Sequence, residues 1–365
     1  MEAGRPDMRA ALTRAMTAVA LASALIALAS SSAQEPAKSP LGLPPVPAAI
    51  AESAAMQRLG ERLFFDRSLS ANNTLSCAMC HIPAQGFTSN QSALAIGLEG
   101  RSLRRNAPTL YNVVFKKFLF HDGRETDLVA QVWGPLLAAD EMGNPAIGPL
   151  LDRLRADAAY GPGFAEAFPG EGVSMTTLGR AVAAYEATLL KGDSRFDRAI
   201  FGGEKSALTP LEWRGYEIFV SKGGCVSCHA IGDHEALFTD QSWHNTGVGF
   251  AIRASATTRV ELAPGVFQTV RLTDLGLSAA TQKSDLGRFE ITGKPQDRWA
   301  FTTPTLRGVR ETWPYMHDGS LKSLEQVVDF YDRGGGPNPA LDSRIKPLGL
   351  SDDEKKALIA FLSSL

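Results

Sequence analysis

All four cysteines of this 365-residue chain fall into two copies of one short pattern, Cys-x-x-Cys-His. The copies read "CAMCH" and "CVSCH" and contain Cys77, Cys80, His81, Cys225, Cys228 and His229. At this spacing two thiols can add to the two vinyl groups of a haem, and the adjacent imidazole can reach its iron. A structural zinc site would need four clustered ligands, and a thioredoxin-like pair would be one lone Cys-x-x-Cys near a strand and a helix. The pattern therefore predicts two covalently bound c-type haems.

The N-terminal segment has the pattern of an export signal. Three arginines precede an apolar run over residues 15–29, and Ser31 and Ala33 form a small-x-small cleavage pattern before Gln34. The run is short for a membrane span, with an uncleaved anchor as the alternative. Covalent haem c is assembled outside the cytoplasm, which agrees with export. We therefore expect a signal peptide over residues 1–33, a periplasmic protein, and no stable membrane insertion after signal removal.

The rest of the chain is long enough for two domains of ordinary size. A weak duplication supports two, because Gly60 and Phe64 precede the first motif as Gly215 and Phe219 precede the second. The formal net charge of -2 gives no sign of a nucleic-acid surface. The predicted divisions are an irregular lead-in over 34–47, an N-terminal haem domain over 48–205 and a C-terminal haem domain over 206–365.

Helix signals dominate the sequence. Thr209, Pro210 and Glu212 form a helix start with a cap, a first-turn proline and a capping-box glutamate. Ser351 caps a C-terminal amphipathic segment. Residues 259–272 instead read as two β-rich runs around a Pro-Gly pair, which favours a hairpin. The predicted fold class is mainly α, with two cytochrome c-like haem domains and a small β-hairpin insertion in the second.

The segment "RRNAPTLYNVVFKKFLFHDGRETDLVAQVWGPLLAADEMG", residues 104–143, resembles the bacterial dihaem cytochrome c peroxidase and MauG family. The second half supports the same family through "DLGRFEITG", "FTTPTLRGVRETWPYMHDGS" and "LEQVVDFYDRGG". The resemblance runs from about Gly60 to the C-terminus, with a loose match over residues 250–280. It implies a peroxide-reactive N-terminal haem and an electron-transferring C-terminal haem.

The resemblance assigns a distal pocket to the N-terminal haem. Gln131 and Glu141 would line it and Pro135 would form its wall, with Glu141 as the acid and base. Cleavage of bound peroxide needs a proton moved between its oxygens, and a carboxylate near the iron can move it. The alternative is that Glu141 lies in an exposed loop, as most glutamates do.

Two departures concern the space around this haem. Family members whose N-terminal iron is closed at rest carry a histidine just after an Ile-Gly pair, whereas this chain has Leu98 there. The resemblance therefore implies an open iron in the resting ferric protein. His121 replaces the tryptophan that usually lies between the haems; either its imidazole carries electrons or it hydrogen-bonds a haem propionate.

A third departure concerns the second haem. The usual methionine ligand lies fourteen residues past the histidine of the "PYMHDG" stretch, and counting from His317 gives Tyr331. Tyr331 shares a helix face with Leu324 and Val328, which suits a ligand and an ordinary core tyrosine equally. The resemblance to MauG-like and MbnH-like members, with tyrosine at this place, favours ligation. Met316 is the competing ligand.

Family members also bind calcium between the haems, and the matching positions are Asn106, Thr312 and Pro314. The resemblance implies that Asn106 would bind through its side chain, and Thr312 and Pro314 through their backbone carbonyls. Oxygen-only ligation suits calcium, although water could fill the same gap.

The resemblance thus implies a dihaem oxidoreductase that reacts with hydrogen peroxide at the haem on His81. It would share the oxidising equivalents with a haem on His229 and Tyr331, and would oxidise a partner protein. The alternative is peroxide reduction with electrons from a small redox protein, a cytochrome c or a cupredoxin. A further alternative is a non-catalytic electron carrier with both irons closed, for which His244 or Met142 would have to ligate the first haem.

Overall fold

The computed structural model describes residues 39–47, 50, 53–250, 257–263, 266–271 and 285–365. The predicted signal peptide lies outside these residues. The described part of the lead-in, residues 39–47, contains no helix or strand. Residues 39–365 form one unit by their internal contacts. Within the described ranges, no helix is both long and apolar enough to cross a membrane.

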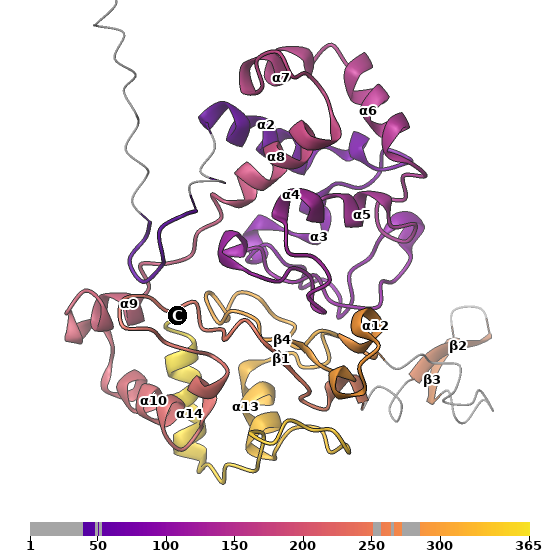
Figure 1. Ribbon diagram of the computed structural model, residues 1–365. Coiled ribbons are helices and arrows are strands. Elements are labelled where there is room, and N and C mark those ends of the chain that lie inside the picture. The colour runs from indigo at the N-terminus through magenta and orange to yellow at the C-terminus, as the bar shows by residue number, and fades with distance from the viewer. Residues whose placement is uncertain (1–38, 48–49, 51–52, 251–256, 264–265, 272–284) are drawn as a thin grey trace, which may run out of the picture. The chain divides into compact units, whose positions relative to one another are not determined.

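The described chain is mostly helical, with two small antiparallel sheets (Figure 1). Its first half contains the helices α2 Ala54–Phe65, α3 Cys77–Cys80, α4 Leu128–Gln131, α5 Trp133–Leu137, α6 Ile147–Ala156, α7 Gly161–Ala167 and α8 Met175–Glu186. Its second half contains α9 Arg195–Ile200, α10 Pro210–Val220, α12 Phe289–Thr292, α13 Leu324–Asp332 and α14 Asp352–Leu362. The strands are β1 Trp243–His244, β2 Thr257–Ala263, β3 Val266–Arg271 and β4 Phe301–Thr302.

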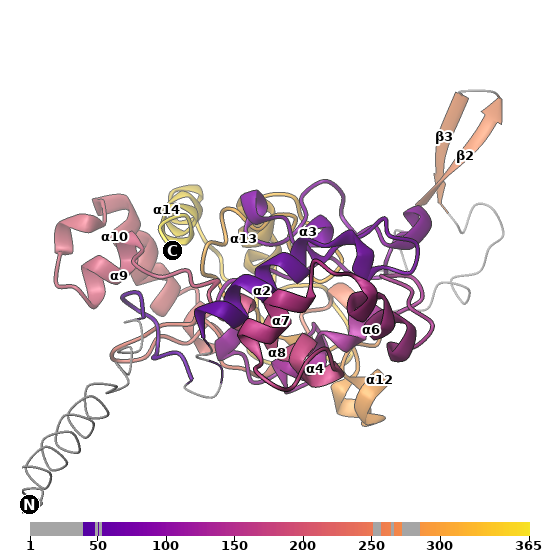
Figure 2. The ribbon, with the colours of Figure 1, turned by 90° about the horizontal axis from the view of Figure 1, so that it is seen from above.

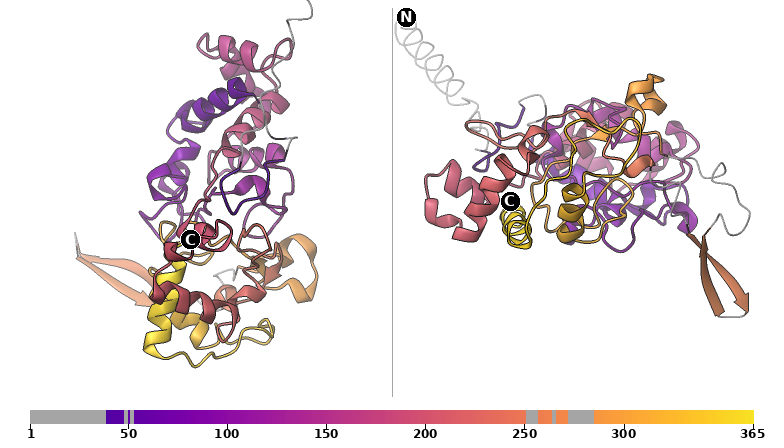
Figure 3. Two further views of the ribbon diagram at one scale, coloured as in Figure 1. Left: turned by 90° about the vertical axis from the view of Figure 1, so that its left-hand side faces the viewer. Right: turned by 90° about the horizontal axis from the view of Figure 1, so that it is seen from below.

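The two glycines of the weak duplication lie at matching helix crossings. A Cβ on Gly60 of α2 would lie 1.8 Å from the Ala181 carbonyl oxygen of α8, and one on Gly215 of α10 would lie 2.0 Å from that of Ala357 of α14. Figure 2 shows α2 beside α8, and Figure 3 gives further views of α10 and α14. Each half thus packs a helix that precedes its Cys-x-x-Cys-His motif closely against a later helix. Glycine at the crossing makes that approach possible.

The local predictions of helix ends and of the hairpin are confirmed. Thr209 with Glu212 and Ser351 with Glu354 form capping boxes at the starts of α10 and α14. Strands β2 and β3 pair antiparallel, with Thr257 opposite Arg271. The Pro-Gly pair between these strands lies outside the described residues.

A second repeat combines a backbone bridge with a short sequence match. Leu119 bridges Glu125 in the first half, and Tyr315 bridges Leu321 at the same spacing in the second. The residues after Leu119 and Tyr315 adopt left-handed conformations, with φ of 63° and 69°. In both halves the sequence His-Asp-Gly follows, and a helix begins three residues past the bridge.

Buried ion pairs join the two halves near these repeats. The Arg105 guanidinium contacts Asp122 at 2.6 Å and Asp285 at 2.7 Å, and all three side chains are largely buried. The backbone N–H of Asn106 donates to the carbonyl of His317 at 2.7 Å. The first HDG segment is thus held against the second half of the chain.

Candidate haem-binding active site

The first Cys-x-x-Cys-His motif folds into one helical turn that presents its histidine. Cys77 and Cys80 begin and end α3, and the backbone N–H of His81 donates to the Cys77 carbonyl at 2.9 Å. The Nδ1 of His81 lies 2.9 Å from the carbonyl oxygen of Phe87. If Nδ1 carries the proton for this bond, Nε2 keeps the lone pair that an iron needs. Burial lowers the pKa of His81, which favours the neutral imidazole.

The second motif repeats this arrangement. The Nδ1 of His229 lies 2.9 Å from the carbonyl oxygen of Phe238, and burial lowers the pKa of His229 as well. Phe87 and Phe238 share a left-handed backbone, with φ of 56° and 52°. His81 and His229 are therefore oriented by the same kind of contact with a backbone carbonyl. This predicts the same role for both histidines.

The residues around the second motif fit a haem. Cys225, Cys228 and His229 line one cavity of about 290 Å³. All four thiols of the chain are free. A Cβ on Gly223 would lie 3.3 Å from the Cys225 sulfur, so the glycine keeps space beside it. Two free thiols and an oriented imidazole on one cavity wall are what covalent haem attachment requires.

Tyr331 and its competitor Met316 both line this second cavity. Burial raises the pKa of Tyr331, and the nearby Cys228 and Cys225 thiols raise it further. In a haem-loaded chain those sulfurs are uncharged thioethers, so burial alone remains. Buried phenolate is therefore unfavourable here unless a bound metal cation supplies the compensating charge.

The predicted distal residues of the first site come from the segment after the HDG repeat. Gln131 ends α4, Pro135 lies within α5, and Glu141 lies in the loop that follows. Glu141 is half-buried, burial raises its pKa, and its charge acts on the Cys77 and Cys80 thiols. The loop placement agrees with the alternative that Glu141 is an ordinary loop residue, but its side chain is not fully exposed and its charge raises the pKa of the Cys77 and Cys80 thiols.

Leu98, the residue after the Ile-Gly pair, lies against the loop that carries Glu141. Its backbone N–H points at the carbonyl oxygens of Asp140 and Glu141, 3.1 Å and 3.0 Å away. A Cβ on Gly97 would lie 1.8 Å from the Asp140 oxygen, so the two segments approach as closely as glycine allows. The backbone at position 98 is thus held against the Glu141 segment, and its leucine side chain offers no ligand atom.

The backbone repeat also relates Pro135 to Tyr331. Counting ten residues on from the bridge residues Glu125 and Leu321 gives Pro135 and Tyr331. Proline carries no side-chain donor atom, whereas tyrosine carries a phenol oxygen. Equivalent places in the two halves therefore hold a residue that cannot ligate iron and one that can.

His121 lies next to a second histidine that the sequence interpretation left without a role. The rings of His121 and His317 lie edge to face with centroids 6.5 Å apart, and both residues line the cavity. The Nε2 of His121 lies 2.9 Å from the Asn106 carbonyl oxygen, whereas the buried Nε2 of His317 has no partner. Burial lowers the pKa of His121 to about 4 and that of His317 to about 3. The repeated HDG triplet was the available signal for this pair.

The three predicted calcium positions line the same cavity. They are Asn106, Thr312 and Pro314. The Asn106 side chain donates to the Ala93 carbonyl at 3.0 Å, and its oxygen has only a long 3.5 Å contact with the Thr88 hydroxyl. That oxygen is available to a cation, so calcium stays a prediction at this place.

The two residues considered as closing ligands for the first haem lie in different surroundings. His244 lines the second cavity, with its ring nitrogens 2.7 Å from Asp342 and 2.8 Å from Asp240. Met142 is buried in the apolar core of the first half. His244 thus lies at the second motif, whereas the core that holds Met142 also packs against Cys77 of the first, so a closed first iron stays the alternative prediction.

Glu186, at the end of α8, is a buried acid that sequence reasoning missed. It is 6 % exposed, and one of its carboxylate oxygens has no partner. Burial raises its pKa to about 8, and its charge acts on the Cys77 thiol. No local pattern marks it, because only the tertiary fold buries this helix end.

We expect the Glu186→Gln variant to lose a pH dependence of stability that the wild type has. A folded-state pKa above the unfolded value of 4.5 means that wild-type stability falls as pH rises from about 4.5 to about 8. The fall is at most about 5 kcal/mol at roughly 1.4 kcal/mol per pKa unit. Urea unfolding at pH 5 and pH 9 measures it. Glu166→Gln, an exposed control, should keep the wild-type dependence; equal dependence in wild type and Glu186→Gln would contradict the assignment.

Comparisons with known proteins agree with this geometry. Residues 54–205 match the family model described as di-haem cytochrome c peroxidase. The chain is 38 % identical over 327 residues to the cytochrome-c peroxidase IdrP2 of Denitromonas iodatirespirans, covering 88 % of this chain and 84 % of that protein. It is 36 % identical over 310 residues to the methylamine utilization protein MauG of Methylorubrum extorquens, covering 84 % and 77 %. A solved MauG-like protein associated with microbial copper homeostasis is 30 % identical, with a TM-score of 0.70 and coverage of 92 % and 95 %.

Two oriented histidines beside paired thiols, in a mostly helical chain with these relatives, define a dihaem peroxidase. The chain belongs to the di-haem cytochrome c peroxidase family, which includes proteins named MauG and cytochrome-c peroxidase. It is a peroxide-reactive oxidoreductase with two haem groups.

Proposed function

We propose that this peroxidase is a periplasmic enzyme that oxidises a partner protein, using hydrogen peroxide at the haem site of His81. Bound haem would supply an iron able to accept peroxide at the first site and a second redox centre at the other. We further propose that residues 48–205 and 206–365 form the two cytochrome c-like haem domains. The relatives named MauG and MauG-like support protein oxidation over simple peroxide removal.

The observation that carries this proposal is the asymmetry between Pro135 and Tyr331. Equivalent backbone positions offer no donor at the first site and a phenol at the second. Leu98 beside the Glu141 loop also supplies no ligand to the first site. One open and one closed iron is the arrangement that lets peroxide enter at one place while the other stores an oxidising equivalent.

The chain's own residues would then divide the work at the first site. Glu141 takes a proton from the inner peroxide oxygen and returns it to the outer one, a role in which a raised pKa is useful near neutral pH. Gln131 orients the peroxide by hydrogen bonding, and Pro135 keeps the pocket wall free of ligands. His121, with His317 beside it, lies in the cavity wall between the two halves and is proposed as the path for electrons. A calcium ion on Asn106, Thr312 and Pro314 is proposed to hold this region together.

A second candidate is peroxide reduction with electrons from a cytochrome c or a cupredoxin. The relative named cytochrome-c peroxidase favours it. It would require a C-terminal haem that is easily reduced, for which Met316 is the suitable ligand. The identity of the second haem's ligand therefore separates the two candidates.

The Tyr331→Met variant tests this choice. Phenolate is a hard anionic donor that stabilises ferric iron, and methionine ligation raises the potential. We expect the reduction potential of the C-terminal haem to rise by a fraction of the about 0.8 V range that axial ligands span. Spectroelectrochemical titration measures it.

Tyr315→Phe is the matched control. Tyr315 lines the same cavity, but its hydroxyl donates to the Val309 carbonyl at 3.0 Å. Its loss should leave the potential unchanged. If Tyr331→Met also leaves it unchanged, Met316 is the better ligand and the cytochrome c peroxidase reading replaces protein oxidation.

A further inference from the structure

Tyr111 forms a hydrogen-bonded pair with a carboxylate at the surface. Its hydroxyl donates to Glu311 at 3.0 Å, and the other Glu311 oxygen contacts the Lys191 ammonium at 2.7 Å. Lys191 also lies 5.2 Å from the centre of the Tyr111 ring. Burial and the Glu311 hydrogen bond raise the pKa of Tyr111 to about 12, so the resting residue is a neutral phenol. A phenol that already donates a hydrogen bond to a carboxylate is suited to losing an electron and that proton together.

The ring of Tyr111 packs against the segment that holds the first haem ligand. It meets the Phe87 ring edge to face with centroids 5.8 Å apart, and the Phe87 carbonyl oxygen lies 2.9 Å from the Nδ1 of His81. A Cβ on Gly86 would lie 3.2 Å from the Tyr111 ring. One residue therefore separates Tyr111 from the imidazole of His81.

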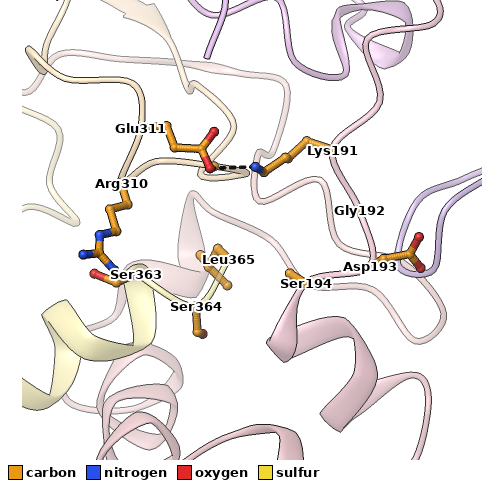
Figure 4. Close-up of a pocket in the computed structure, with 10 residues that line it drawn as sticks. Lys191, Gly192, Asp193, Ser194, Arg310, Glu311, Ser363, Ser364 and Leu365 are labelled. Carbon is orange, nitrogen blue, oxygen red and sulfur yellow. Dashed lines mark hydrogen bonds and ion pairs between the residues drawn. The ribbon is translucent and has the colours of Figure 1, made fainter. Parts of the chain in front are cut away.

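Residues in contact with Tyr111 line a surface pocket. A Cβ on Gly308 would lie 3.0 Å from the Tyr111 ring, and Gly308 lines a cavity of about 580 Å³ with Lys191, Arg310 and Glu311. Figure 4 shows the Lys191 and Glu311 pair at this pocket, with Arg310 and Asp193 also on its wall. The volume lies within the about 300–1,000 Å³ typical of ligand sites. A reductant in this pocket would be one glycine away from the phenol ring.

We propose that Tyr111 is the redox residue through which an oxidising equivalent leaves the first haem site for an aromatic side chain of a partner protein that enters this pocket. This inference rests on the proposed oxidation of a protein. Tyr111 gives one electron to the haem site that hydrogen peroxide has oxidised, and its phenolic proton passes to Glu311. The resulting neutral radical takes an electron from the reductant and recovers the proton from Glu311. Two such passes supply the two electrons that convert one peroxide, with two protons, into two waters.

A second tyrosine and carboxylate pair lacks the surface pocket that a relay to a partner protein needs. Tyr160 donates to Asp66 and has Arg62 over its ring, but it is 1 % exposed in the core of the first half. Tyr160 therefore has a carboxylate as proton acceptor but does not line the surface pocket beside Tyr111. The positive charge of Lys191 opposes oxidation of Tyr111 to a cation. Loss of the electron therefore requires that the phenolic proton passes to Glu311 at the same time.

The test is freeze-quench EPR of the haem-loaded protein after one equivalent of hydrogen peroxide, with the optical spectrum recorded on the same samples. We expect a tyrosyl signal in wild type that narrows when the tyrosine rings are deuterated. The signal should be lost in Tyr111→Phe and kept in the Tyr160→Phe control. Glu311→Gln, which leaves the ring packing intact, should weaken the signal because the proton has no carboxylate acceptor.

The outcomes separate this inference from the proposed function. If peroxide changes the wild-type haem spectrum but the tyrosyl signal survives in Tyr111→Phe, the Tyr111 relay is overturned and the peroxide chemistry stands. An undiminished signal in Glu311→Gln overturns the role of the carboxylate even if Tyr111→Phe fails to fold. If peroxide leaves the wild-type spectrum unchanged, the relay and the proposed function fall together.

Discussion

Replacing Glu141 with glutamine is expected to slow the reaction with hydrogen peroxide about 10²- to 10⁴-fold, the usual contribution of positioned proton transfer. Both haems should stay attached, because Glu141 lies in a loop outside the two Cys-x-x-Cys-His motifs. In wild type, the rate should rise as pH passes upward through the pKa of Glu141, since only the carboxylate accepts a proton. Burial raises that pKa, so the rise should come at a higher pH than for an ordinary glutamate. The rate of the Glu141→Gln variant should show no such rise with pH.

Stopped-flow spectroscopy measures these rates. The matched control is Asp140→Asn, which removes an adjacent but exposed carboxylate and should keep a near wild-type rate. A Glu141→Gln rate within twofold of wild type would remove Glu141 from the reaction and restore the view that it is an ordinary loop residue.

Replacing His81 with glycine is expected to abolish the reaction with peroxide, while His229→Gly should leave the first iron able to bind it. Both haems should remain attached through their thioethers, so each variant isolates one histidine ligand. The two histidines have the same hydrogen bond to a backbone carbonyl, at 2.9 Å in each case, so the variants are closely matched. Any difference in reactivity then arises from the other face of each iron.

The optical change on adding one equivalent of peroxide is the measurement for both variants. The reverse result, with His229→Gly inert and His81→Gly reactive, would mean that the roles of the two haems are exchanged. It would also mean that the open iron is at the Tyr331 site and not at the Pro135 site.

Features that depend on neighbouring residues in the chain could be predicted from the sequence. The capping boxes at Thr209 and Ser351 and the hairpin of β2 and β3 follow from short-range preferences, and the structure confirms them. The correspondence of Gly60 with Gly215 was visible as a repeat, and its cause, two close helix crossings, appears in the structure.

Features made by residues far apart in the chain could not be predicted. Glu186 has no sequence signal, because its burial depends on what packs around the end of α8. His244 was considered for the first haem, but its carboxylate partner Asp342 comes from a distant segment and fixes it at the second cavity.

The central claim is that one iron is open and the other closed at rest. The EPR spectrum of the resting ferric protein tests it most directly, since an iron with one strong protein ligand is high-spin and an iron with two is low-spin. We predict equal amounts of a high-spin signal from the haem on His81 and a low-spin signal from the haem on His229 and Tyr331. Two low-spin signals would contradict the claim and favour a non-catalytic electron carrier.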